Sequence, residues 1–559
     1  MSKNEKVAVP GEMSHREILL VLVGLMAGMF LSALDQSVVG TAMRTIADDL
    51  HGLELQAWVT TAYLITSTIS TPIYGKLGDI FGRRRLFIIA IAIFVAGSAL
   101  SSLSSSMLEL AGWRAVQGIG AGGLFSLAIT VLSDIVPPRE RARYQGYTLA
   151  VFATSSVLGP VVGGLFADAG MILGIAGWKW IFLINVPIGA LALFLVWKFL
   201  HVPHTPVKHR IDWLGAITII MAVVPILLVA ENGRTWGWTS TESISCYVIG
   251  VVGIVAFILA ERIAKHEAIL PLSLFKSKVF TSVTILGVIV GIGMFGGMMT
   301  IPLVLQIVKG VSPTESGFLM LPMVLGMMTA SIVSGTITGK TGKYKIFMIT
   351  GTGMLLLGYI SMFSFQYNTP IWVMSISMII IGAGLGQLMQ TLTLAAQNAV
   401  SPQDIGVATS SSMFFRQMGG TLGVAVFISI LFNRLPDAIK SATKVPEVQN
   451  GMTDAAKEYI AGAMSGKYKA DNPNVVFLKD AAANPAALGD KLNGDSSFLT
   501  HLDPRLARPF LMGFADSAVT VFITAAAVVA IAFAMSFFIK AQPLRTKSAA
   551  AEAAASSAH

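Results

Sequence analysis

Long apolar stretches recur along nearly the whole chain and are separated by short polar segments. A helix needs about 20 consecutive apolar residues to cross the hydrocarbon core of a bilayer. The pattern therefore predicts an all-α integral membrane protein with fourteen transmembrane helices. The expected spans are 17–43, 57–77, 86–104, 107–134, 144–167, 179–200, 212–231, 243–262, 279–307, 316–338, 346–365, 371–399, 406–433 and 509–540.

Three segments lie outside this pattern. Residues 1–16 and 541–559 are predicted to be tails that flank the first and last spans. The largest irregular segment, 434–508, separates the last two spans, and its turn-forming runs surround TDAAKEYIAGAMSGK (453–467), which has the pattern of a short amphipathic helix. We expect 434–508 to be a solvated cap or, alternatively, a docking surface for an outer protein partner.

The composition excludes a soluble protein, because only 12% of the residues are charged and 54% are hydrophobic, whereas soluble domains contain about 25% charged residues. The net charge of +9 does not indicate nucleic-acid binding, since the basic residues lie in loops between spans. Loops on one side hold most of them. The short loops opposite hold only Arg44, Lys179, Arg234 and Lys309. This asymmetry predicts a multi-pass protein of a bacterial cell membrane with both termini in the cytoplasm.

Only two of the 39 Lys and Arg residues, Arg114 and Arg416, lie within the apolar stretches, and Asp35 is the one carboxylate at a similar depth. Charges near the bilayer midplane are costly and usually line a polar pathway. The three residues therefore predict a transporter. Asp35 and Arg114 form either a permanent structural ion pair or a switch in which protonation of Asp35 releases Arg114.

Two glycine-containing motifs interrupt the apolar pattern. The segment GKLGDIFGRRR (75–85) joins the second and third spans on the predicted cytoplasmic side. Its glycines allow close backbone packing, and its acid can pair with an arginine or face a helix N-terminus. It is either a plain topogenic loop or a conformational gate. The proposed gating residues are Gly75, Gly78, Asp79, Gly82, Arg83 and Arg84.

The second motif lies in the fifth span, where Gly159, Pro160, Gly163 and Gly164 follow one another closely. Proline inside a helix removes a hydrogen bond and kinks the helix. The motif predicts either a static packing kink or a pliable hinge.

These motifs resemble those of the major facilitator superfamily, and the resemblance covers almost the entire sequence. GKLGDIFGRRR looks like its signature loop, and RAVQGIG (114–120) resembles the fourth-span motif of its proton-coupled members. SSVLGPVVGG (155–164) looks like the fifth-span motif of its antiporters. LDQSVV (34–39) and KWIFLINVP (179–187) are similar to motifs of the fourteen-span drug–proton antiporters.

The resemblance implies two six-helix bundles, 17–200 and 279–540, joined by a linker with two additional central spans, 201–278. It implies proton coupling through Asp35, Arg114 and Gln117, a proton gradient as the energy source and no cofactor. Members that export dications carry an additional acid in the tenth span. Residues 316–338 contain none, which argues against dicationic substrates. The second-half counterpart of the signature loop, GTITGKTGKYK (335–345), also lacks the acid.

The function that these features predict is proton-coupled export of lipophilic, drug-like compounds. An alternative is export of a lipid or cell-envelope precursor to an outer partner through 434–508, and a weaker one is a non-transporting membrane sensor. An enzyme is not expected, because the spans contain no HExxH motif, no paired aspartates and no Ser–His arrangement. The patterns GIGAGG (118–123) and GIGMFG (291–296) lie inside apolar spans, where glycine serves helix packing and does not bind nucleotides.

Overall fold

The computed structural model describes residues 15–51, 55–136, 158–167, 169–200, 212–265, 267–469, 471–483 and 501–544, together with 144, 148, 151, 154, 155 and 499. The predicted tails lie outside this part except for residues 15–16 and 541–544, as do 201–211 and nine of the 24 residues of the span 144–167. The described chain is almost entirely helical, which confirms the all-α prediction. The exception is a hairpin of two short antiparallel strands, β1 (Met171–Ile172) and β2 (Ile175–Ala176).

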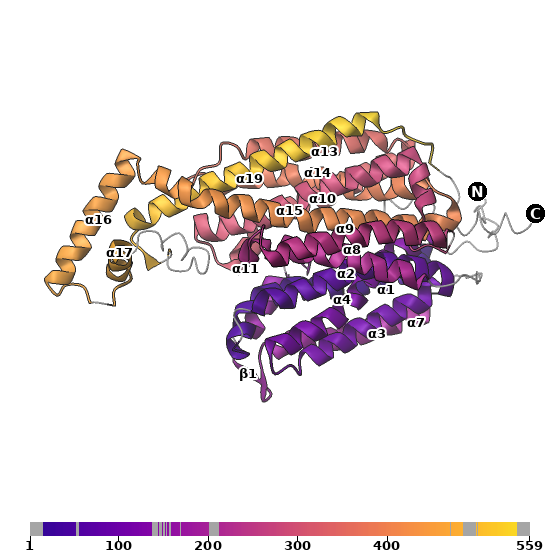
Figure 1. The fold of residues 1–559 in the computed structure, drawn as a ribbon, viewed down its shortest axis with the longest axis horizontal. Helices are drawn as coiled ribbons and strands as arrows, with labels where there is room; N and C mark the ends of the chain where they lie inside the picture. Colours follow the sequence, from indigo (N-terminus) through magenta and orange to yellow (C-terminus); the bar gives the residue numbers. More distant parts are fainter. Residues whose placement is uncertain are drawn as a thin grey trace, which may run out of the picture.

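The helices fall into two groups and a connecting pair (Figure 1). The first group contains α1 (His15–Asp49), α2 (Gln56–Phe81), α3 (Arg83–Ser101), α4 (Met107–Ile135), the helix Leu158–Ala167, α6 (Lys179–Leu183) and α7 (Asn185–Phe199). The connecting pair is α8 (Trp213–Trp236) and α9 (Thr241–Ala264). The second group contains η2 (Leu272–Lys276), α10 (Lys278–Lys309), α11 (Pro313–Leu319), α12 (Leu321–Thr341), α13 (Lys345–Ser361), α14 (Ile371–Asn398), η3 (Pro402–Asp404), α15 (Ile405–Ala442) and α19 (Pro504–Phe538).

Ten of the described helices are long and apolar enough to cross a membrane. Shorter apolar helices include Leu158–Ala167 and Lys345–Ser361, so the number fourteen stays a prediction. The thirteenth span differs from the expected 406–433, because α15 continues to Ala442. The continuation is helical since Leu435, Ala438 and Ala442 repeat at helical spacing and are buried.

Each group of helices packs around its own apolar core. One cluster of side chains joins α10 through α15 and α19, while separate clusters join α1, α2, α3, α4 and α7. The connecting helix α8 lies against α2 and α15, where Ile65, Val223 and Phe414 belong to one cluster. The bundles therefore meet mainly through α2 and α15, with α8 covering one side of the contact (Figure 1).

The segment between α15 and α19 is helical in two of its described parts, while residues 484–498 and 500 lie outside the described residues. It contains α16 (Pro446–Met464) and α17 (Pro473–Ala483), and α16 confirms the amphipathic helix expected within 453–467. Ion pairs join α16 to the start of α19: Glu458 to Arg505 at 2.8 Å and Glu447 to Arg508 at 3.1 Å. Figure 1 shows α16 projecting from the end of the bundles at which α15 ends and α19 begins.

The tightest helix contact in the first bundle lies between α2 and α4. A β-carbon added to Gly122 would overlap the Ser67 carbonyl oxygen and the Ser70 hydroxyl, and one added to Gly118 would overlap the Tyr63 carbonyl oxygen. The absence of side chains at these two positions allows the helices to approach backbone to backbone.

We expect Gly122→Ala to destabilise the folded protein, because overpacking a close contact costs about 1–3 kcal/mol. Gly112→Ala, on the same helix, is the matched control, since a β-carbon there meets nothing within 4 Å and alanine favours a helix more than glycine does. Thermal unfolding of the purified proteins in detergent should give a lower midpoint for Gly122→Ala and an unchanged or higher one for Gly112→Ala. Equal midpoints for the two variants would contradict the close α2–α4 contact.

Candidate functional site

The three residues predicted to couple protons lie together in the first bundle. Arg114 Nη1 donates to a carboxylate oxygen of Asp35 and, at 2.7 Å, to Gln117 Oε1. Gln117 Nε2 donates to Asp35 Oδ1 at 2.9 Å. Asp35, Arg114 and Gln117 are 1%, 2% and 0% exposed. The carboxylate is thus enclosed by an opposite charge and neutral donors.

Two further residues that the sequence did not single out complete this centre. Asn185, at the start of α7, donates to Asp35 Oδ1 at 2.9 Å and to Ser98 Oγ at 2.9 Å. The Arg114 guanidinium lies 4.2 Å from the centroid of the Tyr63 ring, in a cation–π contact. In the sequence, Asn185 is one residue of KWIFLINVP and Tyr63 is a tyrosine in an apolar stretch. Neither pattern is specific enough to predict a contact with Asp35 or Arg114.

The arrangement can respond to a proton. As an anion, Asp35 accepts three hydrogen bonds, from Arg114, Gln117 and Asn185. A proton on Asp35 removes the charge that holds Arg114 and replaces an acceptor by a donor. Breaking a buried pair by removing one partner typically costs about 3–5 kcal/mol, so protonation favours a rearrangement of these helices.

The hinge motif lies beside the same part of α1. A β-carbon on Gly159 would overlap the Ser37 hydroxyl, and one on Gly163 would lie 2.8 Å from the Val38 carbonyl oxygen, whereas Gly164 faces no atom within 4 Å. Ser37 Oγ donates to the Ser155 carbonyl oxygen at 2.9 Å. Pro160 thus lies in the helix Leu158–Ala167, which packs closely on α1 two and three residues beyond Asp35.

The proposed gating residues form a second polar centre at the opposite end of α2. Arg83 Nη2 donates to Asp79 Oδ1 at 2.8 Å, and Arg83 also pairs with Asp134 at the end of α4, which sequence reasoning missed. Gly82 has a φ of +90°, a conformation suited to glycine, and it ends α2 just before α3 begins. Arg84 donates to the Trp197 carbonyl oxygen at 2.5 Å.

This loop also contacts the second bundle. A β-carbon on Gly75 would overlap the side chain of Ser410, and one on Gly406 would overlap the carboxylate of Asp79. Gly78 packs against Leu127 of α4. Asp79 therefore lies at the first turn of α15, where the helix dipole favours a negative charge. The signature loop joins α2, α3 and α4 to α15.

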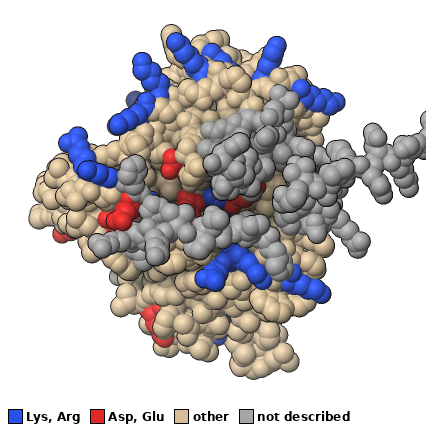
Figure 2. Space-filling model, turned by 90° about the vertical axis from the view of Figure 1, so that its right-hand side faces the viewer, with Lys and Arg blue, Asp and Glu red and all other residues tan. Residues whose placement is uncertain are grey.

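Figure 2 shows the end of the molecule at which α2, α9 and α19 end and α8, α10 and α15 begin. Lys and Arg side chains are prominent around its rim, and Asp and Glu lie among the atoms nearer its centre. The basic side chains on this face agree with the basic loops expected from the sequence.

Arg416, the deep charge of the second half, differs from Arg114. Its side chain lies in α15 and is 7% exposed. Within the described part of the chain, Arg416 Nη1 has no hydrogen-bond partner, and no carboxylate lies within ion-pair distance of the guanidinium. The structure does not bring Arg416 together with Asp35 or Arg114 in any hydrogen bond.

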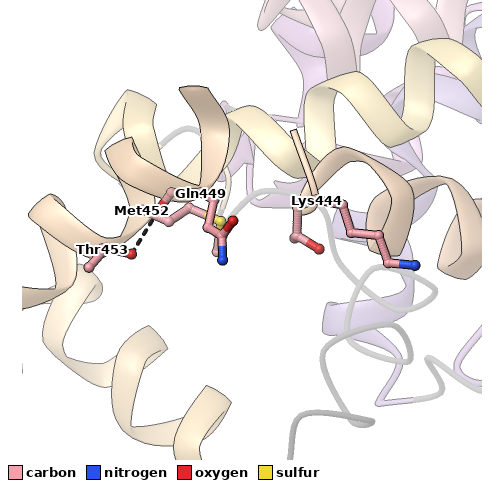
Figure 3. A pocket seen from close by; sticks show the side chains of 5 residues that line it. Lys444, Gln449, Met452 and Thr453 are labelled. Carbon is pink, nitrogen blue, oxygen red and sulfur yellow. Dashed lines mark hydrogen bonds between the residues drawn. The ribbon is translucent and has the colours of Figure 1, made fainter. Parts of the chain in front are cut away.

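A pocket of about 530 Å³ lies elsewhere, at the turn from α15 to α16 (Figure 3). Thr443, Lys444, Gln449, Met452 and Thr453 line it, and Thr453 donates to the Gln449 carbonyl oxygen at 2.8 Å. No group of three or more His, Cys, Asp or Glu side chains suited to a metal ion is found among the residues that the structure describes.

The sequence profile of the Major Facilitator Superfamily matches residues 25–424. The chain belongs to this superfamily. The profile spans the Asp35 centre, the signature loop and Arg416, so the predicted family is confirmed and the chain is assigned as a transporter and not as an enzyme.

Relatives with similar overall length support the assignment. Multidrug transporter protein MdtP of Bacillus subtilis (strain 168) is 35% identical over 549 residues, which cover 97% of this chain and 96% of that protein. Multidrug resistance protein 3 of the same organism is 35% identical over 427 residues, covering 75% and 81%. Efflux pump FUS6 of Gibberella moniliformis (strain M3125 / FGSC 7600) is 31% identical over 460 residues, covering 80% of each.

Solved structures show the same fold. The proton:xylose symporter XylE superposes with a TM-score of 0.53 at 17% identity, covering 75% of this chain and 90% of that one. A bacterial homolog of the human lysosomal transporter Spinster superposes with a TM-score of 0.52 at 17% identity, covering 95% and 100%. The predicted major facilitator fold is confirmed.

If the signature loop holds the two bundles together, Arg83→Gln should slow transport by about tenfold, which corresponds to about 1.4 kcal/mol of lost conformational preference. Substrate binding should persist, since Arg83 contacts only Asp79 and Asp134. Arg85→Gln is the matched control because Arg85 is exposed and makes no ion pair in the described chain. Equilibrium binding in detergent and transport in vesicles should be measured on one preparation. Lost binding with normal turnover of bound substrate would refute the gating role.

Proposed function

We propose that this chain is a proton-coupled exporter of lipophilic, drug-like compounds. Relatives named as multidrug transporters and efflux pumps support drug export. The single observation that best supports proton coupling is the buried Asp35–Arg114 pair, closed by Gln117 and Asn185. An acid whose partners lie on two other helices, α4 and α7, is suited to changing the packing of those helices when it is neutralised.

In this proposal, Asp35 carries the proton. Its protonation frees Arg114 and Gln117 to turn away, which loosens the contacts of α1 with α4 and α7. The neighbouring helix Leu158–Ala167 follows, because Gly159 and Gly163 fix it to α1. Release of the contacts between the signature loop and α15 then opens the end that is closed in the described conformation.

We infer that this closed end faces the cytoplasm of the cell membrane. The loops there contain most of the basic residues of the chain, as the positive-inside rule requires. Compounds would then leave through the opposite end, where α16 and α17 project. The ion pairs of Arg505 and Arg508 dock α16 on α19, which favours the interpretation of 434–508 as a cap and assigns no protein partner to it.

Asp35→Asn should abolish proton-driven export, because the amide is a permanently neutral substitute for the acid. Exchange of labelled for unlabelled substrate without a gradient should persist, since that exchange needs no proton transfer. Asp48→Asn is the matched control, because Asp48 lies on the same helix but is exposed. Dye transport into proteoliposomes with and without an imposed pH gradient measures both modes. Undiminished gradient-driven transport by Asp35→Asn would overturn the assignment of the proton carrier.

Replacement of 446–500 by a flexible Gly/Ser linker should leave dye transport in proteoliposomes nearly intact if this segment is a cap. The cost of closing a loop grows only slowly with its length, and α15 and α19 pack against each other without the segment. The control is Arg505→Ala with Arg508→Ala, which undocks α16 but retains it. A correctly folded deletion protein without transport would place the segment in the transport cycle.

A further inference from the structure

The guanidinium of Arg416 is a buried charge without a counterpart. It is 7% exposed, and its Nη1 lacks a hydrogen-bond acceptor in the described structure. Arg114, by contrast, has a carboxylate, an amide oxygen and an aromatic ring around it. A buried cation is costly unless it is paired and hydrogen-bonded, so the unsatisfied state of Arg416 needs a reason.

The second half of the chain supplies no carboxylate that could reach it. Between residues 268 and 436 the sequence contains two acids, Glu315 and Asp404. Glu315 belongs to the capping box of α11, which follows the C-terminal end of α10. Asp404 precedes Arg416 by twelve residues, or about 18 Å along the same helix. No rotation of the Arg416 side chain brings it to either acid.

Polar but neutral groups lie on the same face of α15 as Arg416. Thr409, Ser412 and Arg416 recur there at helical spacing, and Gln397 of α14 donates to Thr409 Oγ1 at 2.9 Å. The buried amides of α14 bond to other helices, since Gln387 accepts from Thr350 of α13 and Gln390 accepts from Ser331 of α12. This face of α15 offers hydrogen bonds to a polar ligand but no negative charge.

Close packing fixes the position of Arg416. A β-carbon on Gly291 of α10 would overlap the Arg416 carbonyl oxygen, and one on Gly419 would overlap that of Val288. The two helix backbones therefore touch at the level of Arg416 and fix the position of its backbone. The guanidinium Nη1 still has no hydrogen-bond acceptor in the described structure. A positioned donor with no protein acceptor is the arrangement of a ligand-binding group.

We propose that Arg416 binds the oxyanion of an otherwise lipophilic molecule, and that the substrates of this exporter include lipophilic organic anions. A carboxylate, sulfonate or phosphate can accept two parallel hydrogen bonds from a guanidinium. The inference rests on the proposed export function and narrows its substrate class. It agrees with the scarcity of acids in the second-half spans, where Asp516 of α19 lies 3.9 Å from Arg434 and is not paired with Arg416.

Two probes with the same aromatic skeleton test this assignment: anilinonaphthalene sulfonate and neutral N-phenylnaphthylamine. Binding in a neutral detergent and gradient-driven transport into phosphatidylcholine vesicles are measured for the wild type, Arg416→Gln and Arg416→Lys. We expect Arg416→Gln to weaken binding and transport of the sulfonate by about tenfold or more, the scale of a lost charge-assisted hydrogen bond. Binding and transport of the neutral probe should change by less than about twofold. Arg416→Lys should show an intermediate loss for the sulfonate, because lysine keeps the positive charge but lacks the paired N–H donors of the guanidinium.

Equal losses for the two probes in Arg416→Gln, or no loss for the sulfonate, would overturn the assignment. If neither variant folds, the wild type decides. Unlabelled naphthalene sulfonate should displace the anionic probe more strongly than a neutral competitor of equal apolarity does. Equal displacement by the two competitors would refute the proposal. A sulfonate defect that appears only in vesicles containing phosphatidylglycerol would identify a lipid headgroup as the occupant and overturn the substrate assignment. Failure of the wild type to transport either probe under a gradient would refute proton-coupled export itself, which separates the two hypotheses.

Discussion

A carboxylate in the middle of an apolar bundle is stable only if its charge is balanced and its oxygens receive donors. Asp35 meets this condition through Arg114, Gln117 and Asn185, which come from α4 and α7. The constraint therefore determines how α1, α4 and α7 pack at their centres. It also makes their arrangement conditional on the protonation state of one residue, which a core of purely apolar contacts would not do.

The two halves treat their deep arginines differently. In the first half, the charge of Arg114 is cancelled within the protein, and Tyr63 covers its guanidinium. In the second half, Arg416 is buried and has no carboxylate partner among the described residues. A protein that uses one half to exchange protons and the other to bind the transported molecule needs such a division, because a ligand cannot displace a partner as well held as Asp35. The two halves thus differ in their deep charges, because Arg114 is paired with a carboxylate and Arg416 is not.

Much of this organisation could be predicted from the sequence, because long apolar stretches with isolated charges leave few alternatives in a membrane. The pairing of Asp35 with Arg114 was predicted from their depth, whereas Gln117 was assigned to proton coupling only through the family resemblance. Asn185 was not, since it lies 150 residues from Asp35 and depends on how α7 packs. The contact of Asp79 with Gly406 was also missed, because it joins the two bundles and no local pattern reports their relative placement. The docking of α16 on α19 was also missed, since the ion pairs Glu458–Arg505 and Glu447–Arg508 join residues far apart in the sequence.

The proton centre and the gate are connected by the same two helices. α4 carries Arg114 and, twenty residues or about 30 Å further along, Asp134, which pairs with Arg83. α2 carries Tyr63 at the first centre and Asp79 at the second. Because Gly118 and Gly122 hold α2 and α4 backbone to backbone, neither helix can shift at the Asp35 centre without displacing the other. In the proposed function, a change at Asp35 would therefore reach the Arg83 ion pairs as a movement of this pair of helices, which requires no chain of side-chain contacts between the two centres.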